Sequence, residues 1–162
     1  MKTIAVTAQS HTSFIAISGE TIIGKLEYPK WYSTKAIITV DGIAYPLEPR
    51  GFWQSTQELL KDNAVLLTIK ATWQGGYVIT KPKDVERPLI FRGKGMFKNG
   101  YLLLNYKDEV LLEIASNFSW KKFNADYTIT CNDNFLEEEF SKVLIMLSVH
   151  FYKAIQNAAV GT

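Results

Sequence analysis

Short β-rich apolar runs alternate with polar turn signals from about residue 3 to residue 131. Runs of this kind, bounded by Gly, Asn, Asp or Pro, predict β-strands. Asp41-Gly42 between two such runs is typical of a hairpin, because a type I′ turn needs positive φ at both central positions. The predicted strands are Ser13–Ser18, Thr21–Tyr28, Ala36–Val40, Ile43–Leu47, Val65–Lys70, Tyr77–Thr80, Met96–Phe97, Tyr101–Leu104, Val110–Ile114, Ser119–Phe123 and Tyr127–Cys131.

The connections between these runs are short, which predicts antiparallel neighbours, since a parallel pair needs a long crossover. About a dozen strands in one meander must close into a barrel or split into two sheets. Two segments interrupt the pattern. The segment from Gln54 to Asp62 fits a helical turn or another strand, and Lys81–Pro88 is polar and bounded by prolines, so we predict a surface loop there.

The pattern changes to that of a helix after residue 132. Asn132–Asn134 offers an N-cap, and Glu137–Glu139 would place carboxylates in a first turn, so we predict a helix from about 135 to about 158. From Val143 to Tyr152 its apolar residues cover the whole circumference, which is typical of a helix buried on every side. The alternative is a helix on the outside of a sheet. The prediction is therefore a mainly β fold, a closed antiparallel barrel around a central hydrophobic C-terminal helix.

Composition narrows the classes of function. The length of 162 residues indicates one domain, and a net charge of +2 argues against a dedicated nucleic-acid binder. The start of the sequence lacks an apolar signal segment, and the apolar run Val143–Val149 is shorter than the ~20 residues of a membrane-spanning helix. We therefore expect a cytoplasmic protein with no transmembrane segment, in which peripheral membrane association stays open.

Candidate catalytic and metal-binding groups are sparse. A nucleophile needs a histidine base held by a third group, and metals need closely spaced ligands. We interpret His11 as a solvated turn residue, His150 as a hydrogen-bonded core or barrel-mouth residue, and Cys131 as a small buried hydrophobe. The sequence predicts no catalytic residue, no metal site and no cofactor.

Basic residues are in excess between Lys81 and Lys98. The candidate site for an anion or a lipid head group is Arg92, Lys94 and Lys98, because the intervening glycines allow close backbone approach. The alternative is a solvated surface whose lysines protect strand edges.

The order of several segments over nearly the whole chain resembles a known fold. The segments are Phe14–Tyr28 followed by Ile37–Leu47, Phe91–Gly95 leading into Tyr106–Ile114, and Ala125–Ile129 just before Glu137–Tyr152. Their order and spacing resemble the tubby C-terminal-like fold, most closely its LURP-one-related type and more distantly the phospholipid scramblases. The resemblance implies one domain over residues 1–162, with strands over about 3–131 threaded by the last helix. It implies no known catalytic activity.

Departures from the related branches limit what the resemblance implies. The cysteine-rich and proline-rich segments of scramblases are absent here, and the basic residues with which tubby proteins bind phosphoinositides have no matching positions. The expected function is a non-catalytic module that binds an anionic phospholipid or a protein partner. The alternative is a lipocalin-like carrier of a small hydrophobic ligand, which would need a hollow barrel.

Overall fold

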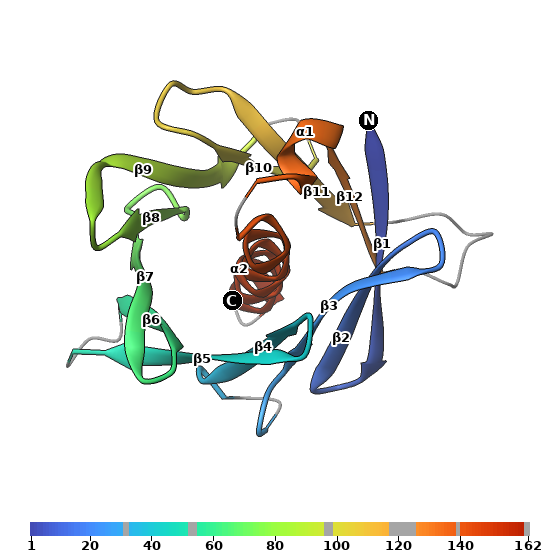
Figure 1. Ribbon diagram of the computed structural model, residues 1–162, viewed down its shortest axis with the longest axis horizontal. Coiled ribbons are helices and arrows are strands. Elements are labelled where there is room, and N and C mark those ends of the chain that lie inside the picture. The colour runs from blue at the N-terminus through green and yellow to red at the C-terminus, as the bar shows by residue number, and fades with distance from the viewer. Residues whose placement is uncertain (31–32, 52–54, 96–98, 117–125, 139, 161–162) are drawn as a thin grey trace.

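Twelve antiparallel strands form a closed barrel in the computed structural model, which describes residues 1–30, 33–51, 55–95, 99–116, 126–138 and 140–160 (Figure 1). Each strand pairs with its neighbours in sequence, and β12 pairs with β1 to close the ring. The strands are β1 (Lys2–Ser10), β2 (Ser13–Ser18), β3 (Thr21–Glu27), β4 (Ala36–Val40), β5 (Ile43–Arg50), β6 (Thr56–Lys61), β7 (Ala64–Ala71), β8 (Tyr77–Lys81), β9 (Asp84–Gly93), β10 (Tyr101–Leu104), β11 (Val110–Ser116) and β12 (Tyr127–Cys131). The predicted fold class is confirmed.

Two helices follow the strands, a short α1 (Asp133–Leu136) and a long α2 (Ser141–Val160). Figure 1 shows α2 inside the ring of strands. Every side chain from Val143 to Tyr152 is at most 5% exposed, including Ser148 and His150. A helix without a polar face needs such an environment, because apolar surface on any side would otherwise stay in water. The predicted enclosed helix is confirmed.

Side chains from the inner faces of the strands and from α2 fill the interior together. Phe151 lies at the centre of an aromatic group, with its ring centroid 4.2 Å from that of Tyr77 and 5.3 Å from that of Phe91. Both Phe151 and Phe91 are fully buried. The barrel is therefore a packed core around a helix.

Strands occupy parts of two segments that the sequence pattern left open or predicted as a loop. The segment left open at Gln54–Asp62 contains strand β6, whose Leu59 and Leu60 are buried. The predicted surface loop at Lys81–Pro88 is wrong, because β9 begins at Asp84 and pairs with β8 and β10. Its polar residues face outward from a strand. The predicted strands at 96–97 and 119–123 lie outside the described residues.

The predicted start of the long helix is also wrong. Residues 133–136 form the separate helix α1, and α2 begins six residues later than expected. Phe140 has a φ of 64°, a left-handed conformation that a continuous α-helix does not allow. Glu137 and Glu138 therefore lie in a turn between the helices and are exposed, and the first turn of α2 contains no acidic residue.

Gly24 of β3 marks a close approach between the barrel wall and α2. A Cβ atom at this position would lie 2.7 Å from Met146 Cγ and 3.2 Å from the carbonyl oxygen of Thr39. We expect Gly24→Ala to lower the free energy of unfolding, measured by urea denaturation, by about 1–3 kcal/mol through overpacking. The matched control is Gly93→Ala, whose Cβ would make ordinary contacts with Tyr101 and should change stability little.

A double-mutant cycle separates overpacking from other causes. Met146→Ala removes the side chain that an added methyl group would meet, so the cost of Gly24→Ala should fall in that background. An equal cost of Gly24→Ala with Met146 and with Ala at position 146 would contradict the interpretation.

Candidate functional site at the two ends of the barrel

The residues predicted to bind an anion lie on and next to the outer wall. Arg92 is exposed on β9, opposite Leu102 of β10, and forms no ion pair with another described residue. Lys94 follows β9, is half-buried and forms an ion pair with Glu113 of β11. Lys98 lies outside the described residues. Arg92 and Lys94 lie two residues apart, at the end of β9 and just after it. The carboxylate of Glu113 offsets the charge of Lys94.

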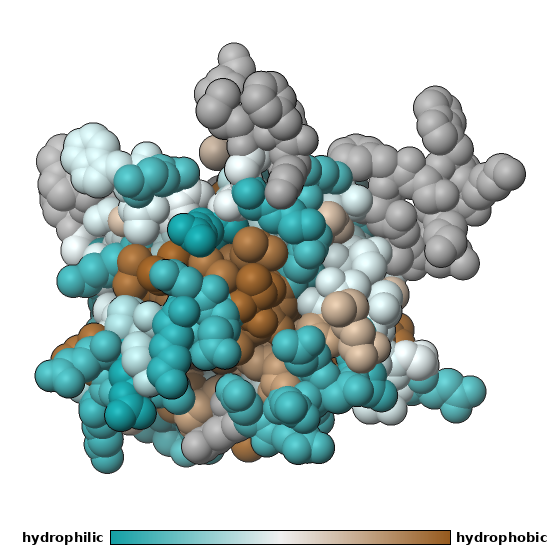
Figure 2. Space-filling view, turned by 90° about the horizontal axis from the view of Figure 1, so that it is seen from above, coloured by the Kyte–Doolittle hydropathy of each residue, from teal (hydrophilic) through white to brown (hydrophobic). Residues whose placement is uncertain are grey.

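The outer wall next to Arg92 carries an apolar area. Figure 2 shows it in the middle of the side formed by the β9–β12 part of the barrel, bordered by hydrophilic side chains. Ile90 of β9 and Leu102 of β10 are half-buried, and they alternate along their strands with Phe91 and Leu103 of the core. Leu104, the last residue of β10, is buried and only 1% exposed.

The alternation of strand directions sorts the connections into two groups. Connections that follow odd-numbered strands lie at one end of the barrel, and those that follow even-numbered strands lie at the other. Helix α2 runs between these ends: Lys142 near its start contacts Asp41 of the β4–β5 turn, whereas Tyr152 contacts Ser116 at the end of β11.

Charge is divided between the two ends. We call the end at which α2 starts the acidic end, because its described connections and helix α1 carry Glu20, Asp41, Asp62, Asp108, Glu109, Asp133, Glu137 and Glu138 against Lys83, Lys107, Lys142 of α2 and the N-terminal ammonium group. The opposite end, which we call the basic end, carries Lys30, Lys35 and Lys94 in its described connections against Asp126. The near-neutral total charge of the chain conceals this separation.

Trp73 lies at the basic end, in the connection between β7 and β8, and its side chain is fully exposed. The exposed ring of Trp73 leaves a large apolar surface in water. Such exposure at a loop tip is typical of a site that contacts a binding partner. Lys35, in the β3–β4 connection at the same end, is exposed as well.

Inside the basic end, His150 of α2 is held by two hydrogen bonds. Tyr28 Oη lies 2.7 Å from His150 Nδ1, and Gln57 Oε1 lies 3.3 Å from His150 Nε2. Since the amide oxygen can only accept, the geometry fits a neutral ring that donates from Nε2 and accepts the Tyr28 hydroxyl proton at Nδ1. Burial, and secondarily the nearby Lys153, lowers the pKa of His150 to about 4.

Lys153 extends from α2 beside this pair. Its Nζ lies 3.8 Å from the centroid of the Tyr28 ring, within the range of a cation–π contact. Burial lowers the pKa of Lys153 and raises that of Tyr28. The interpretation of His150 as a hydrogen-bonded core or barrel-mouth residue is confirmed, and the group joins α2 to β6 and to the start of the β3–β4 connection.

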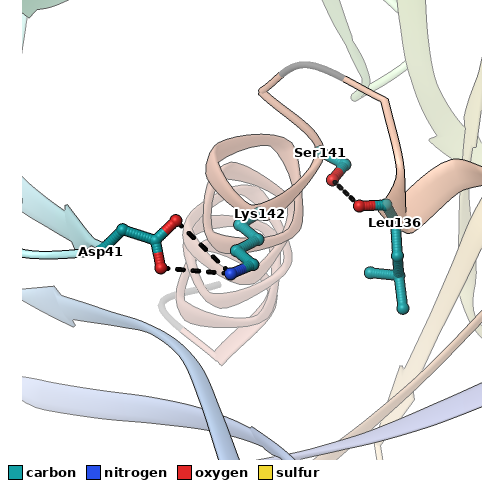
Figure 3. A network of polar contacts seen from close by, with 4 residues as sticks. All are labelled: Asp41, Leu136, Ser141 and Lys142. Carbon is teal, nitrogen blue, oxygen red and sulfur yellow. Dashed lines mark hydrogen bonds and ion pairs between the residues drawn. The ribbon is translucent and has the colours of Figure 1, made fainter.

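The acidic end contains a cavity of about 320 Å³ at the start of α2. Figure 3 shows Lys142 directed toward Asp41, with Nζ–Oδ1 and Nζ–Oδ2 distances of 3.1 and 3.4 Å, while the Ser141 hydroxyl donates to the carbonyl oxygen of Leu136 at 3.2 Å. Tyr45 and Glu138 also line the cavity. Its polar groups come from distant parts of the sequence, so no motif could have indicated it.

Other candidate groups are dispersed. His11 is exposed in the β1–β2 turn, whereas Cys131 is buried, and burial raises the pKa of its thiol. Among the described residues, no three His, Cys, Asp or Glu side chains are grouped so that they could hold a metal ion. No helix in the same part of the chain is long and apolar enough to span a membrane.

Comparisons with known proteins assign this chain to no family. The resemblance to the LURP-one-related type stays a prediction from the sequence. No protein-family model, curated protein or solved structure matches the chain.

Proposed function

We propose that the protein is a non-catalytic binding module whose basic end docks onto an anionic lipid surface. The observation that carries this proposal is the separation of charge along the barrel axis, with the exposed Trp73 on the basic side. The resemblance to a family without known catalytic activity supports the same conclusion. The proposed contact surface includes Lys94 of the predicted site and adds Lys35 and the exposed ring of Trp73.

Electrostatics favours one orientation of the barrel on such a surface. Each basic residue near an anionic membrane contributes about 1 kcal/mol, and the attraction falls off within a Debye length. Tryptophan is enriched at membrane interfaces because its ring is apolar with a polar N–H group. The carboxylates of the acidic end are repelled by the same lipids. The basic end therefore faces the membrane, with the barrel axis steeply inclined to its plane.

The filled interior supports surface binding over carriage of a ligand. A carrier of lipocalin type holds its ligand inside the barrel, where this chain places Phe151, Ile145 and Val149 of α2 without exposure. A ligand in that position would have to displace the helix. Binding through the outer surface requires no such rearrangement.

Co-sedimentation with vesicles tests the proposal. We expect binding to phosphatidylcholine vesicles that contain phosphatidylserine, weak binding to pure phosphatidylcholine, and loss of binding as salt concentration rises. Lys35→Glu removes one positive charge and adds a negative one at the basic end, so the binding constant should fall by about tenfold. Trp73→Ser should weaken binding several-fold even at high salt, since the ring contributes apolar contact.

Lys107→Glu is the matched control, because it reverses an exposed lysine at the acidic end. It should leave vesicle binding unchanged. Arg92→Glu reverses an exposed cation near the end of β9, two residues before Lys94 of the basic end, and should weaken binding as well. Absence of binding to phosphatidylserine vesicles would refute the lipid proposal.

A further inference from the structure

Trp73 is held in solvent by an ordered turn. Its fully exposed side chain lies in the β7–β8 connection, where the amide of Gly75 donates to the carbonyl oxygen of Thr72 at 3.2 Å and the amide of Gly76 donates to Thr72 Oγ1 at 3.0 Å. A Cβ atom at Gly76 would clash with the carbonyl oxygen of Phe91, so the turn also packs closely against β9. Because the turn is pre-organised, covering the ring costs little backbone entropy.

The cavity at the acidic end offers a recess for such a ring. Its volume of about 320 Å³ lies at the lower end of the range of small-ligand sites, about 300–1,000 Å³. Val40 and Val143 form a buried part of its lining. Leu136 and Phe140 in the same lining are half-buried, so the apolar surface reaches solvent beside the start of α2. An aromatic ring that enters this recess leaves water without displacing a core residue.

Charge makes the two ends of the barrel complementary. Asp41 and Glu138 line the cavity and are exposed. Lys142 already pairs with Asp41, so the carboxylate of Glu138 leaves the cavity with a negative charge (Figure 3). The opposite end presents the exposed Lys35 beside the connections that include Trp73. Complementary potentials favour contact between these ends, and the indole N–H group, which can only donate, suits a carboxylate.

The ring and the recess cannot meet within one molecule, because they belong to opposite ends of the barrel. A second copy brings them together, and the pair still presents one unused ring and one unused recess. Such a contact is heterologous, so it builds a row of molecules. An aromatic ring buries about 150–250 Å², well below the about 1,200–2,000 Å² of stable complexes, so the contact is weak and depends on concentration.

We propose that the protein assembles head to tail with copies of itself, and that Trp73 of one copy inserts into the cavity at the start of α2 of the next. The indole N–H group donates to the carboxylate of Glu138, and the ring lies against Leu136 and Val143. This assembly goes beyond the proposed lipid docking. Both contacts use Trp73, so each molecule makes one of them at a time.

Sedimentation velocity in the absence of lipid tests the assembly. At high protein concentration and low salt, the wild type should form oligomers that grow with concentration and shrink as salt is added. Trp73→Ser should weaken self-association by about tenfold or more, because it removes the anchoring ring. Gln74→Ser alters the exposed neighbour in the same turn and should leave self-association unchanged.

A pair of charge reversals locates the other half of the contact. Glu138→Lys changes an exposed residue that lines the cavity and should weaken self-association by about tenfold. Glu20→Lys makes the same change of charge at the same end but outside the cavity, so it should weaken self-association by no more than about threefold.

Mixing two variants identifies the geometry. Trp73→Ser keeps the cavity intact and Glu138→Lys keeps the ring intact, so each alone should be monomeric at a concentration at which the wild type assembles. Their mixture should form a 1:1 dimer and nothing larger, because only one ring and one intact cavity remain between them.

Three outcomes would overturn the proposal. The first is a wild type that stays monomeric up to about 1 mM at low salt. The second is a mixture of the two variants that stays monomeric while the wild type associates, which would indicate a symmetric contact. The third is an equal loss with Glu20→Lys and Glu138→Lys, which would place the contact outside the cavity. Vesicle binding by Glu138→Lys, which retains Trp73, should equal that of the wild type and reports on lipid docking separately.

Discussion

Phe151→Ala is expected to lower the free energy of unfolding by about 3–5 kcal/mol, as large-to-small substitutions of buried aromatic residues do. Phe151 is fully buried and stacks on Tyr77, with Phe91 on another side. Its removal leaves a cavity at the contact between α2 and the wall, where a closed ring of strands has little freedom to collapse. Urea denaturation followed by circular dichroism measures the change.

The matched control is Ile22→Ala, which truncates a side chain that is 59% exposed on β3. It should change the free energy of unfolding by less than about 0.5 kcal/mol. An equal, small effect of both substitutions would mean that α2 does not hold the barrel together.

Acidification should destabilise the protein through His150. Its pKa is about 4 in the folded state and 6.5 in the reference state, so between these values the unfolded chain binds a proton that the folded chain does not. Stability is therefore fully present above about pH 6.5 and falls as pH drops toward 4. The shift corresponds to about 3 kcal/mol, because one pKa unit is equivalent to 1.36 kcal/mol.

Variants separate this effect from the titration of carboxylates in the same range. His150→Gln cannot take up a proton, so its free energy of unfolding, measured by urea denaturation from pH 7 to pH 4, should decline less steeply than that of the wild type. His11→Gln alters an exposed turn histidine and should retain the wild-type slope. Identical slopes for all three proteins would exclude His150 as the source of acid sensitivity.

The fold was predictable where the local pattern and the tertiary structure agree. Apolar residues cover the whole circumference of the helix from Val143 to Tyr152, and this pattern indicated the enclosure that the structure shows. Asp41 and Gly42 adopt the positive φ values of 50° and 78° that a hairpin turn needs. The segment from Lys81 to Pro88 was predicted as a loop because charge and proline indicate one, whereas Asp84 pairs with Lys81 of β8 and the chain continues from there as the first half of β9. Phe140, whose positive φ separates the two helices, interrupts the predicted helix at a position where the sequence gives no signal of a break.

The candidate surfaces were less predictable, because they depend on pairing between distant residues. Nothing in the spacing around Lys94 indicates its partner Glu113, 19 residues later. The basic end did have a signal, namely that every second connection of an antiparallel meander belongs to the same end.

The pairing of β1 with β12 has a consequence for how the chain reaches its native state. The first strand gains its second neighbour only after more than a hundred further residues are available, and the segment that fills the interior, α2, comes later still. A nascent chain therefore holds unpaired edges and an empty centre until synthesis has passed both elements. Such long-range contacts slow folding and leave partly folded forms prone to aggregation.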